Sequence, residues 1–225
     1  MKRSIIALLG SFTLFLAFAA GARAQEKTHF GRIPDEVYYL MPQFSNGTVY
    51  LRGQRPIDGR LNICAVDNTL RFIGPDGDEL TATQDGDIVK VRIDSVMFLR
   101  DQKIFYRMVP YNRDMGVAVQ REVRIFHDAK EGAYGSVSQT ASIQEYGVLY
   151  ADGVVHDLNR KKEYPYKVSE ICCIYKDDQV FPLTKKSLRK LFPARKDEID
   201  AFFKSGAKLP ETVSDALDFL ARWAD

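Results

Sequence analysis

Short segments of alternating apolar and polar residues, separated by tight-turn sequences, run through most of this chain. Clear examples follow one another between residues 87 and 126, where the sequence reads DIVKVRI, VMFLR, KIFYRMV and GVAVQREVRIF. A period of two puts alternate side chains on opposite faces, as in an antiparallel sheet with one buried face. We therefore expect residues 41–182 to form an antiparallel β-sheet or a partly closed barrel, built as a meander of hairpins.

Turn sequences predict where these hairpins reverse. Pro75 and Gly77 favour a hairpin between the segments TLRFI and ELTAT. Residues 151–153 and 177–178 favour two more hairpins further along the chain. The Asn-Gly pair at residues 46–47 predicts a turn before the next strand, because both residue types tolerate a positive φ.

The apolar spacing changes to a helical period near residue 183. Thr184 is the expected N-cap of a first helix, Pro193 separates it from a second, and Gly206 ends the second. A third helix carries one apolar stripe, formed by Val213, Leu217, Leu220 and Trp223. Residues 183–225 should therefore form a C-terminal cap of three short helices, and the whole fold is expected to be α+β.

Residues 1–24 have the features of a secretory signal peptide. Lys2 and Arg3 precede an uncharged apolar run over residues 5–20, and Ala22 and Ala24 give the small-x-small pattern before a cleavage site. The run is shorter than the roughly 18 residues of a membrane-spanning helix, so cleavage after Ala24 is expected. The protein should therefore be exported through the inner membrane.

The mature chain begins with a polar lead over residues 25–40. No cysteine lies near the cleavage site, and no later segment is long and apolar enough to span a bilayer. We therefore expect a periplasmic or outer-envelope associated protein that is neither lipid-anchored nor transmembrane.

Charge excludes one large class of partners. The chain has 32 basic and 30 acidic residues, but residues 1–24 hold three of the basic ones and no acid. The mature chain therefore has 29 basic and 30 acidic residues, a net charge of −1. Without a positive field, nucleic acid is not an expected partner, since phosphate neutralisation supplies most of its affinity.

The three cysteines are an odd number for a disulfide framework. Cys172 and Cys173 are neighbours, so on a strand their side chains point to opposite faces and only one could meet Cys64. One disulfide from Cys64 to Cys172 or Cys173 is one interpretation. Buried free thiols that act as small apolar residues are the other, and it is favoured because all three lie in apolar strand segments.

Histidine and motif patterns give no catalytic or metal site. His156 precedes Asp157, but neighbouring residues on a strand face opposite sides, so a surface position is favoured over an acid/base pair. The same holds for His127 and Asp128. The sequence contains no zinc-binding spacing, no phosphate-binding loop and no nucleophile elbow, and no cofactor is expected.

A polar and aromatic segment at residues 132–142 is the main candidate binding site. With the neighbouring tyrosine it offers hydroxyl, amide and aromatic groups that can hydrogen-bond to and stack on a ligand or partner. The candidate residues are Tyr134, Ser136, Ser138, Gln139, Thr140 and Tyr146. The alternative is an ordered connector whose hydroxyl groups satisfy its own backbone.

Two charged patterns are weaker candidates. Basic residues gather on the first predicted helices, at Lys185, Lys186, Arg189, Lys190, Arg195 and Lys196. They favour a solvated face, with binding to anionic envelope polymers or lipid headgroups as the alternative. Acidic glycine sequences at residues 76–78 and 85–87 lack the length and terminal Glu of a calcium loop, so turns are favoured there.

Two longer segments carry a family resemblance. GAYGSVSQTASIQEYGVLY at residues 132–150 and LTKKSLRKLFPARKDEIDAFFKSGAKL at residues 183–209 resemble a family of secreted proteins from Bacteroidota that has no established activity. Its members are similar to this chain in the signal peptide and in an early GTVYLRG strand followed by GRLNICAVDNTLRFI. The resemblance covers most of the mature chain and implies an envelope protein of unknown function, with no catalytic residues to carry over from the family.

These observations favour an exported, non-catalytic module that binds a partner protein or an envelope component. One alternative is a hydrolase that uses His156 and Asp157, which requires both side chains to converge with a nucleophile in a pocket. Another is a small-ligand carrier, which requires a β-enclosed cavity larger than its own side chains fill.

Overall fold

The computed structural model describes residues 29–82, 85–126, 150–151, 154–155 and 163–224. Their strands are β1 (His29–Gly31), β2 (Ser45–Leu51), β3 (Ile57–Ile63), β4 (Leu70–Ile73), β5 (Glu79–Thr81), β6 (Ile88–Ile93), β7 (Val96–Asp101), β8 (Ile104–Pro110), β9 (Met115–Ile125), β10 (Tyr150–Ala151), β11 (Val154–Val155), β12 (Tyr164–Lys176) and β13 (Gln179–Pro182). The helices are α1 (Asp35–Tyr38), α2 (Lys185–Leu191), α3 (Lys196–Lys204) and α4 (Val213–Ala224), with 3-10 turns η1 (Asp85–Asp87) and η2 (Pro193–Arg195).

Eleven of these strands form one antiparallel sheet, in the order β1-β12-β9-β8-β7-β6-β2-β3-β4-β5 with β13 beside β12. Strands β6 to β9 are neighbours in sequence and in space, which is the expected meander. Among the described residues, strand pairing does not close the sheet into a barrel. The α+β class predicted from the sequence is confirmed.

The turn predictions hold at three places and are wrong at one. Gly77, with φ of +87°, turns β4 into β5, and Asp177 and Asp178, both at positive φ, turn β12 into β13. Strands β10 and β11 pair across residues 152–153 as expected. Gly47, in contrast, lies inside β2, where the backbone oxygen of Arg92 and the side chain of Leu61 leave no room for a Cβ atom.

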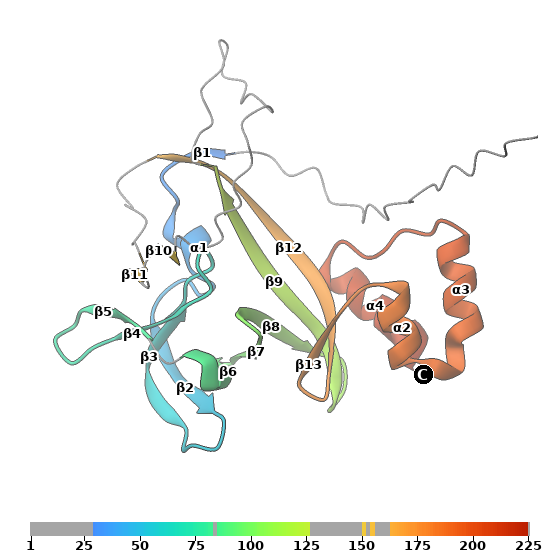
Figure 1. The fold of residues 1–225 in the computed structure, drawn as a ribbon, viewed down its shortest axis with the longest axis horizontal. Helices are drawn as coiled ribbons and strands as arrows, with labels where there is room; N and C mark the ends of the chain where they lie inside the picture. Colours follow the sequence, from blue (N-terminus) through green and yellow to red (C-terminus); the bar gives the residue numbers. More distant parts are fainter. Residues whose placement is uncertain (1–28, 83–84, 127–149, 152–153, 156–162, 225) are drawn as a thin grey trace, which may run out of the picture.

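The longest pairing joins β9 to β12. Eleven residue pairs run from Met115 opposite Lys176 to Ile125 opposite Tyr166. In Figure 1 this two-stranded ribbon extends from the N-terminal strands at one end to the C-terminal helices at the other. Val123, Ile125 and Tyr166 of this ribbon lie in the buried cluster of the N-terminal lead, and Met115 and Ile174 lie in the buried cluster of the C-terminal helices.

A separate cluster of buried apolar side chains lies between the strands of the β-body. Its members are apolar side chains of β2 to β8, most of them less than one-tenth exposed: Val49, Leu61, Ile63, Leu70, Ile88, Val91, Ile93, Phe98 and Phe105. Burial of this kind supplies most of the stabilisation of a domain of this size. The interior of the body is filled by its own side chains at these positions.

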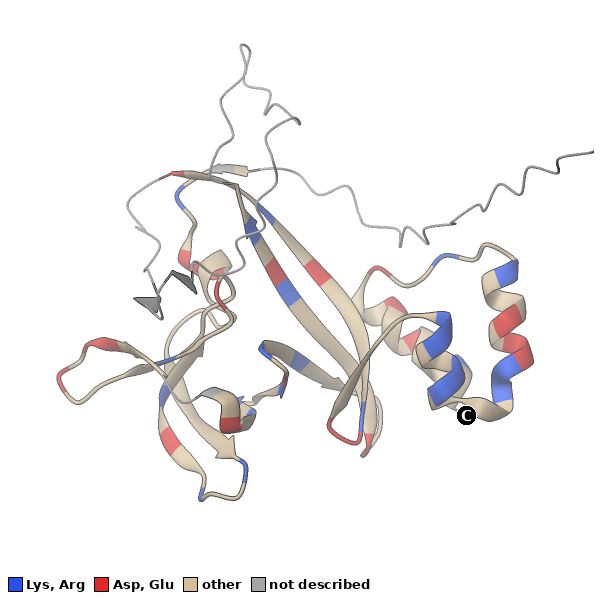
Figure 2. Cartoon of the chain, viewed as in Figure 1, with Lys and Arg blue, Asp and Glu red and all other residues tan. Residues whose placement is uncertain are grey.

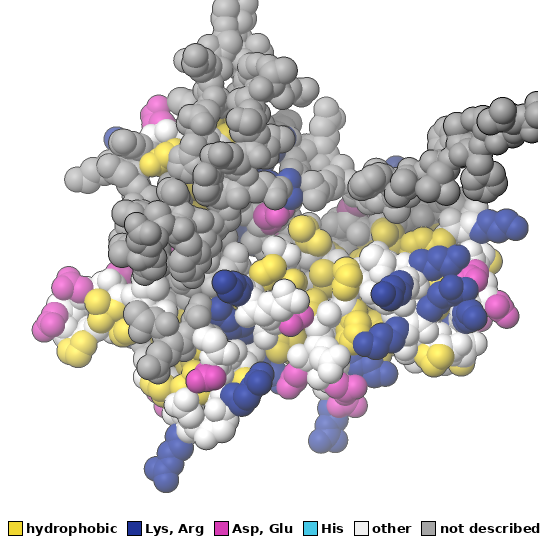
Figure 3. All heavy atoms as spheres, viewed as in Figure 1, with side chains coloured by type: hydrophobic (Ala, Val, Ile, Leu, Met, Phe, Trp, Pro, Cys, Tyr) yellow, Lys and Arg dark blue, Asp and Glu magenta, His cyan; other side chains and the backbone are white. Residues whose placement is uncertain are grey.

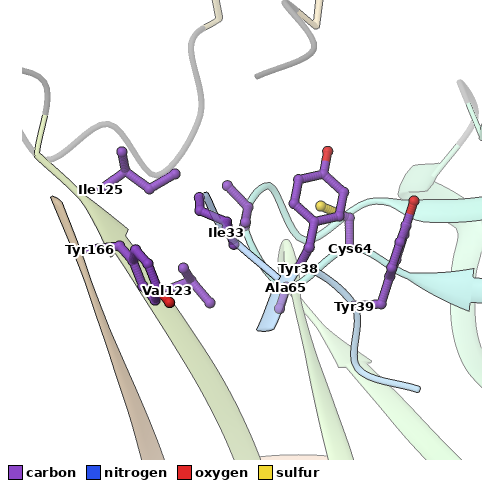
Figure 4. Packing of buried hydrophobic residues seen from close by; sticks show 9 residues of the cluster. Ile33, Tyr38, Tyr39, Cys64, Ala65, Val123, Ile125 and Tyr166 are labelled. Carbon is purple, nitrogen blue, oxygen red and sulfur yellow. The ribbon is translucent and has the colours of Figure 1, made fainter. Parts of the chain in front are cut away.

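Residues 29–40 of the N-terminal lead are structured and cover the end of the ribbon farthest from the C-terminal helices. Ile33 and Tyr38 pack with Val123 and Ile125 of β9 and with Tyr166 of β12. Figure 4 shows these groups facing one another, with the lead between the ribbon and the β3 side of the body. The sequence described this segment only as polar, because its helix has a single turn and its contacts are all distant in sequence.

The C-terminal cap contains the three expected helices. The Thr184 hydroxyl accepts a hydrogen bond from the backbone N–H of Ser187 and caps α2, and Gly206, with φ of +72°, follows the end of α3. The cap packs on the ribbon through α4, where Ala216 lies in one buried cluster with Val117 and Val119. Within the described residues, no helix is both long and apolar enough to cross a membrane.

Candidate functional site

The main candidate residues from the sequence lie outside the residues that the structure describes. This applies to Tyr134, Ser136, Ser138, Gln139, Thr140 and Tyr146, to both members of the His156 and Asp157 pair, and to His127. They stay predictions.

His29 is the described histidine, and it makes a structural contact. Its ring stacks on Tyr166 at a centroid distance of 5.4 Å and an interplanar angle of 21°. It is exposed at the end of the sheet, where β1 pairs with β12. Among the described residues, no group of three or more His, Cys, Asp or Glu side chains is placed to hold a metal ion.

All three cysteines are free and buried. They lie in three different apolar clusters: Cys64 beside Tyr38, Cys172 beneath α4, and Cys173 against Tyr175. The disulfide from Cys64 to Cys172 or Cys173 is therefore not present, because neither thiol of the ribbon shares a cluster with Cys64. The expectation that Cys172 and Cys173 face opposite sides of β12 is confirmed.

Burial keeps these thiols protonated. Burial, with the nearby Asp67 carboxylate, raises the pKa of Cys64 to about 12. Burial is also the main cause that raises the pKa of Cys173, to about 11, and that raises the pKa of Cys172. Since the thiolate is the reactive form, none of the three thiols is suited to act as a nucleophile near neutral pH.

Arg71 of β4 lies in a buried polar network beside Cys64. Its guanidinium donates hydrogen bonds to Asp67 at 2.6 Å and to the hydroxyl of Thr69 at 2.9 Å, and it lies 3.8 Å from Glu79. Burial is the largest single effect and lowers the pKa of Arg71, but Asp67, Cys64 and Tyr38 together outweigh it and raise the pKa above its ordinary value.

The network extends to two tyrosines of the lead. The hydroxyl of Tyr39 donates a hydrogen bond to Glu79 at 2.7 Å, and Tyr38 lies next to the sulfur of Cys64 (Figure 4). Burial, then the Cys64 thiol, raises the pKa of Tyr38 far above its ordinary value. Buried charges with this many partners fix a local structure. We therefore interpret the network as the set of contacts that holds the lead against strands β3 to β5.

Three of the six cations on the basic helical face, Lys185, Arg189 and Arg195, pair with acids of the cap. One carboxylate, that of Asp200 on α3, lies 2.5 Å from Arg189 and 3.3 Å from Lys185, and these two cations lower its pKa despite an opposing effect of desolvation. Arg195 pairs with Glu198 at 2.7 Å. Figure 2 marks the basic positions on α2 and α3 in blue, and Figure 3 shows dark blue basic side chains on the surface of the cap. These internal pairs support the interpretation as a solvated face.

The two acidic glycine sequences are turns. Residues 76–78 lie in the β4–β5 hairpin, with Gly77 at positive φ, and residues 85–87 form η1 before β6. The interpretation favoured from the sequence agrees with this geometry.

An open groove in the cap is the candidate site that the structure adds. It lies between the end of α3, the connector at residues 205–212 and one side of α4, and it has a volume of about 560 Å³. Gly206 and Pro210 shape the connector, because the first takes a positive φ and the second has a fixed one. The hydroxyl of Thr212 then accepts a hydrogen bond from the N–H of Asp215 at the start of α4.

Aromatic and aliphatic side chains line the apolar part of this groove. The rings of Phe202 on α3 and Phe219 on α4 meet edge to face, with their centroids 5.3 Å apart. The ring centroid of the buried Trp223 lies 5.7 Å from that of Phe219. Leu209 and Pro210 of the connector complete the apolar lining. Phe202, Leu209 and Pro210 are only half-buried, which leaves apolar surface accessible in the groove.

Charged side chains of opposite sign line the α4 side of the groove. Glu211, Asp215 and Asp218 lie toward the start of α4, and Arg222 lies toward its end. A second cation, Lys208, lines the groove from the connector. In the part of the chain that the structure describes, no ion pair forms with any of these carboxylates, whereas Asp200 elsewhere in the cap is paired. The unpaired acids are therefore available to a partner.

The guanidinium of Arg222 lies over two aromatic rings. It is 5.9 Å from the centroid of Phe202 and 6.0 Å from that of Trp223. Such stacking holds a guanidinium in place while its N–H groups remain in solvent. Arg222 therefore presents a fixed positive group at one end of the groove.

Sequence reasoning missed this groove. The signal was present in the spacing of Glu211, Asp215, Asp218 and Arg222, since intervals of four, three and four residues place side chains on one face of a helix. The apolar side of the groove comes from Phe202 and Leu209, and nothing in the local sequence shows that α3 and α4 come together.

No protein family, curated protein or solved structure matches the chain. The candidate site therefore rests on its own geometry: an open apolar groove with unpaired carboxylates at one end and a stacked guanidinium at the other.

Proposed function

We propose that this protein is an exported, non-catalytic envelope protein that binds a segment of a partner through the groove of its C-terminal cap. The observation that carries the proposal is the combination, in one open groove, of accessible apolar surface and unpaired charge. Binding sites of proteins typically combine an apolar lining with a few placed polar groups. The proposed partner is a protein or another envelope component that presents a flexible segment.

Thiol chemistry supports a binding role over catalysis by cysteine. The three thiols are buried and have raised pKa values, so they are held as protonated core groups. A hydrolase based on His156 and Asp157 is the alternative from the sequence, and those residues lie outside the described part of the chain. It stays a prediction.

Core packing argues against the small-ligand carrier. Phe98, Phe105 and Ile63 are among the largest fully buried side chains, and they lie where a carrier would need an internal cavity. Interiors packed by large side chains leave little space for a ligand. The groove, in contrast, is open to solvent and lies on the other side of the ribbon.

Export is part of the proposal. It is supported by the signal-peptide pattern of residues 1–24, which favours export of the mature chain to the periplasm or the outer envelope.

The test is affinity purification of the mature chain from its native envelope after brief cross-linking. Three variants accompany the wild type: Asp215→Lys with Asp218→Lys in the groove, Tyr134→Ala with Gln139→Ala in the predicted loop, and Asp197→Lys as an exposed control outside the groove. We expect a specific partner with the wild type, the loop variant and the control. It should be lost with the groove variant.

Two results would contradict the proposal. A partner lost with the loop variant and kept with the groove variant would assign binding to residues 132–142 instead. If no version enriches a specific partner, the chain is not a binding module, and the hydrolase alternative with His156 should be tested by assays for hydrolytic activity.

A further inference from the structure

Along α4, one end of the groove is acidic and the other end is basic. On α4, the acids Asp215 and Asp218 lie within the first half of the helix, and Arg222 lies in the last turn. Lys208 and Glu211 of the connector also line the groove. Asp218 and Arg222 are four residues apart, the spacing at which an ion pair commonly forms on a helix, yet none forms here and Arg222 stacks on aromatic rings instead. The two charges therefore stay separate along the groove.

The distance between the charged residues along α4 determines how long a bound peptide would need to be. Arg222 follows Asp215 by seven positions, which corresponds to about 10 Å along a helix axis. An extended peptide covers that distance with about three residues. Apolar side chains at the centre of such a peptide would lie against Phe219 and the part of Phe202 that the Arg222 guanidinium leaves open, where the two rings meet edge to face at 5.3 Å.

From this arrangement we infer that the groove binds a short, extended peptide segment of a partner protein, with a basic side chain at one end, apolar side chains at the centre and an acidic group at the other end. The basic side chain pairs with Asp215 and Asp218, the apolar side chains cover Phe202 and Phe219, and the acidic group accepts hydrogen bonds from Arg222. This inference rests on the proposed function and specifies its ligand.

Charge complementarity on both ends distinguishes this occupant from others. An acidic peptide would meet Asp215 and Asp218 with like charges, and a purely basic one would place a cation against the guanidinium of Arg222. Each contact of opposite charges at an exposed site contributes a modest factor in affinity, about two- to fivefold. The order of charges along the peptide therefore determines which peptide binds, and apolar contact supplies most of the affinity.

The test uses three synthetic hexapeptides with the same central leucine and phenylalanine. The mixed peptide has two lysines at one end and two glutamates at the other, the basic peptide has four lysines and the acidic peptide has four glutamates. Trp223, the only tryptophan of the chain, lies beside the groove and reports binding through its fluorescence. Titrations use the mature chain at low salt, and calorimetry provides a second readout.

We expect the mixed peptide to bind the wild type at least fivefold more tightly than either of the other two. Arg222→Glu should shift the preference to the basic peptide, and Asp215→Lys with Asp218→Lys should shift it to the acidic peptide. Asp197→Lys, which changes an exposed acid of α3 outside the groove, should leave the order unchanged. Circular dichroism of each variant confirms that the cap is folded.

Failure of this inference is distinguishable from failure of the proposed function. Absence of binding by all three peptides, or the same order of affinities in every variant, would overturn the inference. If the envelope partner is still lost when Asp215 and Asp218 are changed, the proposed function stands while its ligand is not a peptide of mixed charge. If that partner is also absent, both are wrong.

Discussion

The guanidinium of Arg121 donates a hydrogen bond to the backbone oxygen of Tyr39, at 3.4 Å, across a sequence separation of 82 residues. It also donates to the backbone oxygen of Glu36 at 3.1 Å and lies 3.3 Å from Glu170. Arg121 is on β9, and β9 pairs with β8 only up to Val119. The side chain therefore bridges a place where strand pairing has stopped and the sheet stays open.

Removal of this bridge should loosen the N-terminal lead. Arg121→Ala removes the hydrogen bonds that the backbone oxygens of Glu36 and Tyr39 accept, so we expect a loss of about 1–2 kcal/mol in the free energy of unfolding. Arg124→Ala is the matched control, since Arg124 pairs with Glu122 on the same strand, and it should cost less than about 1 kcal/mol. Urea unfolding measures both, and equal effects would contradict the bridging role.

Close packing of β9 predicts a large effect at one glycine. A Cβ atom at Gly116 would collide with the backbone oxygen of Val109 and would lie 2.6 Å from the ring of Tyr175. Gly116→Ala should therefore destabilise the protein by about 1–3 kcal/mol or more.

Gly59 on β3 is the matched control for this substitution. A Cβ atom there meets only the side chain of Leu61, at 3.4 Å, which is close to ordinary contact. Gly59→Ala should change the free energy of unfolding by less than about 1 kcal/mol. Similar denaturation midpoints for both variants would show that β8 and β12 do not approach Gly116 in this way.

Thiol accessibility distinguishes free cysteines from a disulfide. The native protein should react little with a thiol reagent at neutral pH, because Cys64, Cys172 and Cys173 are buried and protonated. After unfolding in urea without a reductant, three thiols per chain should react. A count of one would mean that Cys64 is bonded to a cysteine of the ribbon.

Alkaline stability should depend on Cys64. Its folded pKa, about 12, lies above the ordinary value of 9.0, so the unfolded chain loses the thiol proton first as the pH rises. The contribution is complete below about pH 9 and is lost as the pH rises toward 12. The free energy of unfolding should therefore fall above pH 9, by up to about 1.4 kcal/mol per pH unit for this thiol.

The variant Cys64→Ala isolates this group. Cys173, whose pKa is about 11, contributes in the same direction and remains in the variant. Unfolding curves between pH 8 and pH 10.5 should be less steep in their pH dependence for Cys64→Ala than for the wild type. An unchanged dependence would show that the thiol of Cys64 is not held protonated by burial.

Local signals predicted much of the fold. Period-two alternation predicted the β-body, Gly77 marked a hairpin, and Thr184 and Gly206 marked helix ends, because each acts on the few residues around it. The Asn-Gly signal at residues 46–47 failed because pairing of β2 with both β3 and β6 outweighs a local turn preference.

Features that depend on distant residues were not predicted. The pairing of β9 with β12 joins segments about forty residues apart, and α1 is stabilised by packing against Val123 and Ile125 on that ribbon. The groove is similar, because Phe202 meets Phe219 only after the connector reverses the chain. A single sequence shows which residues are apolar but not which of them meet.

The central claim is that a partner occupies the groove of the cap. The most direct measurement places a photo-crosslinking amino acid at Ala207, an exposed residue of the groove, and separately at Asp76, an exposed residue of the β4–β5 hairpin. Each mature chain is irradiated in its native envelope. We predict a defined cross-linked product from position 207 and none from position 76. Equal products from both positions, or a product from position 76 alone, would contradict the claim.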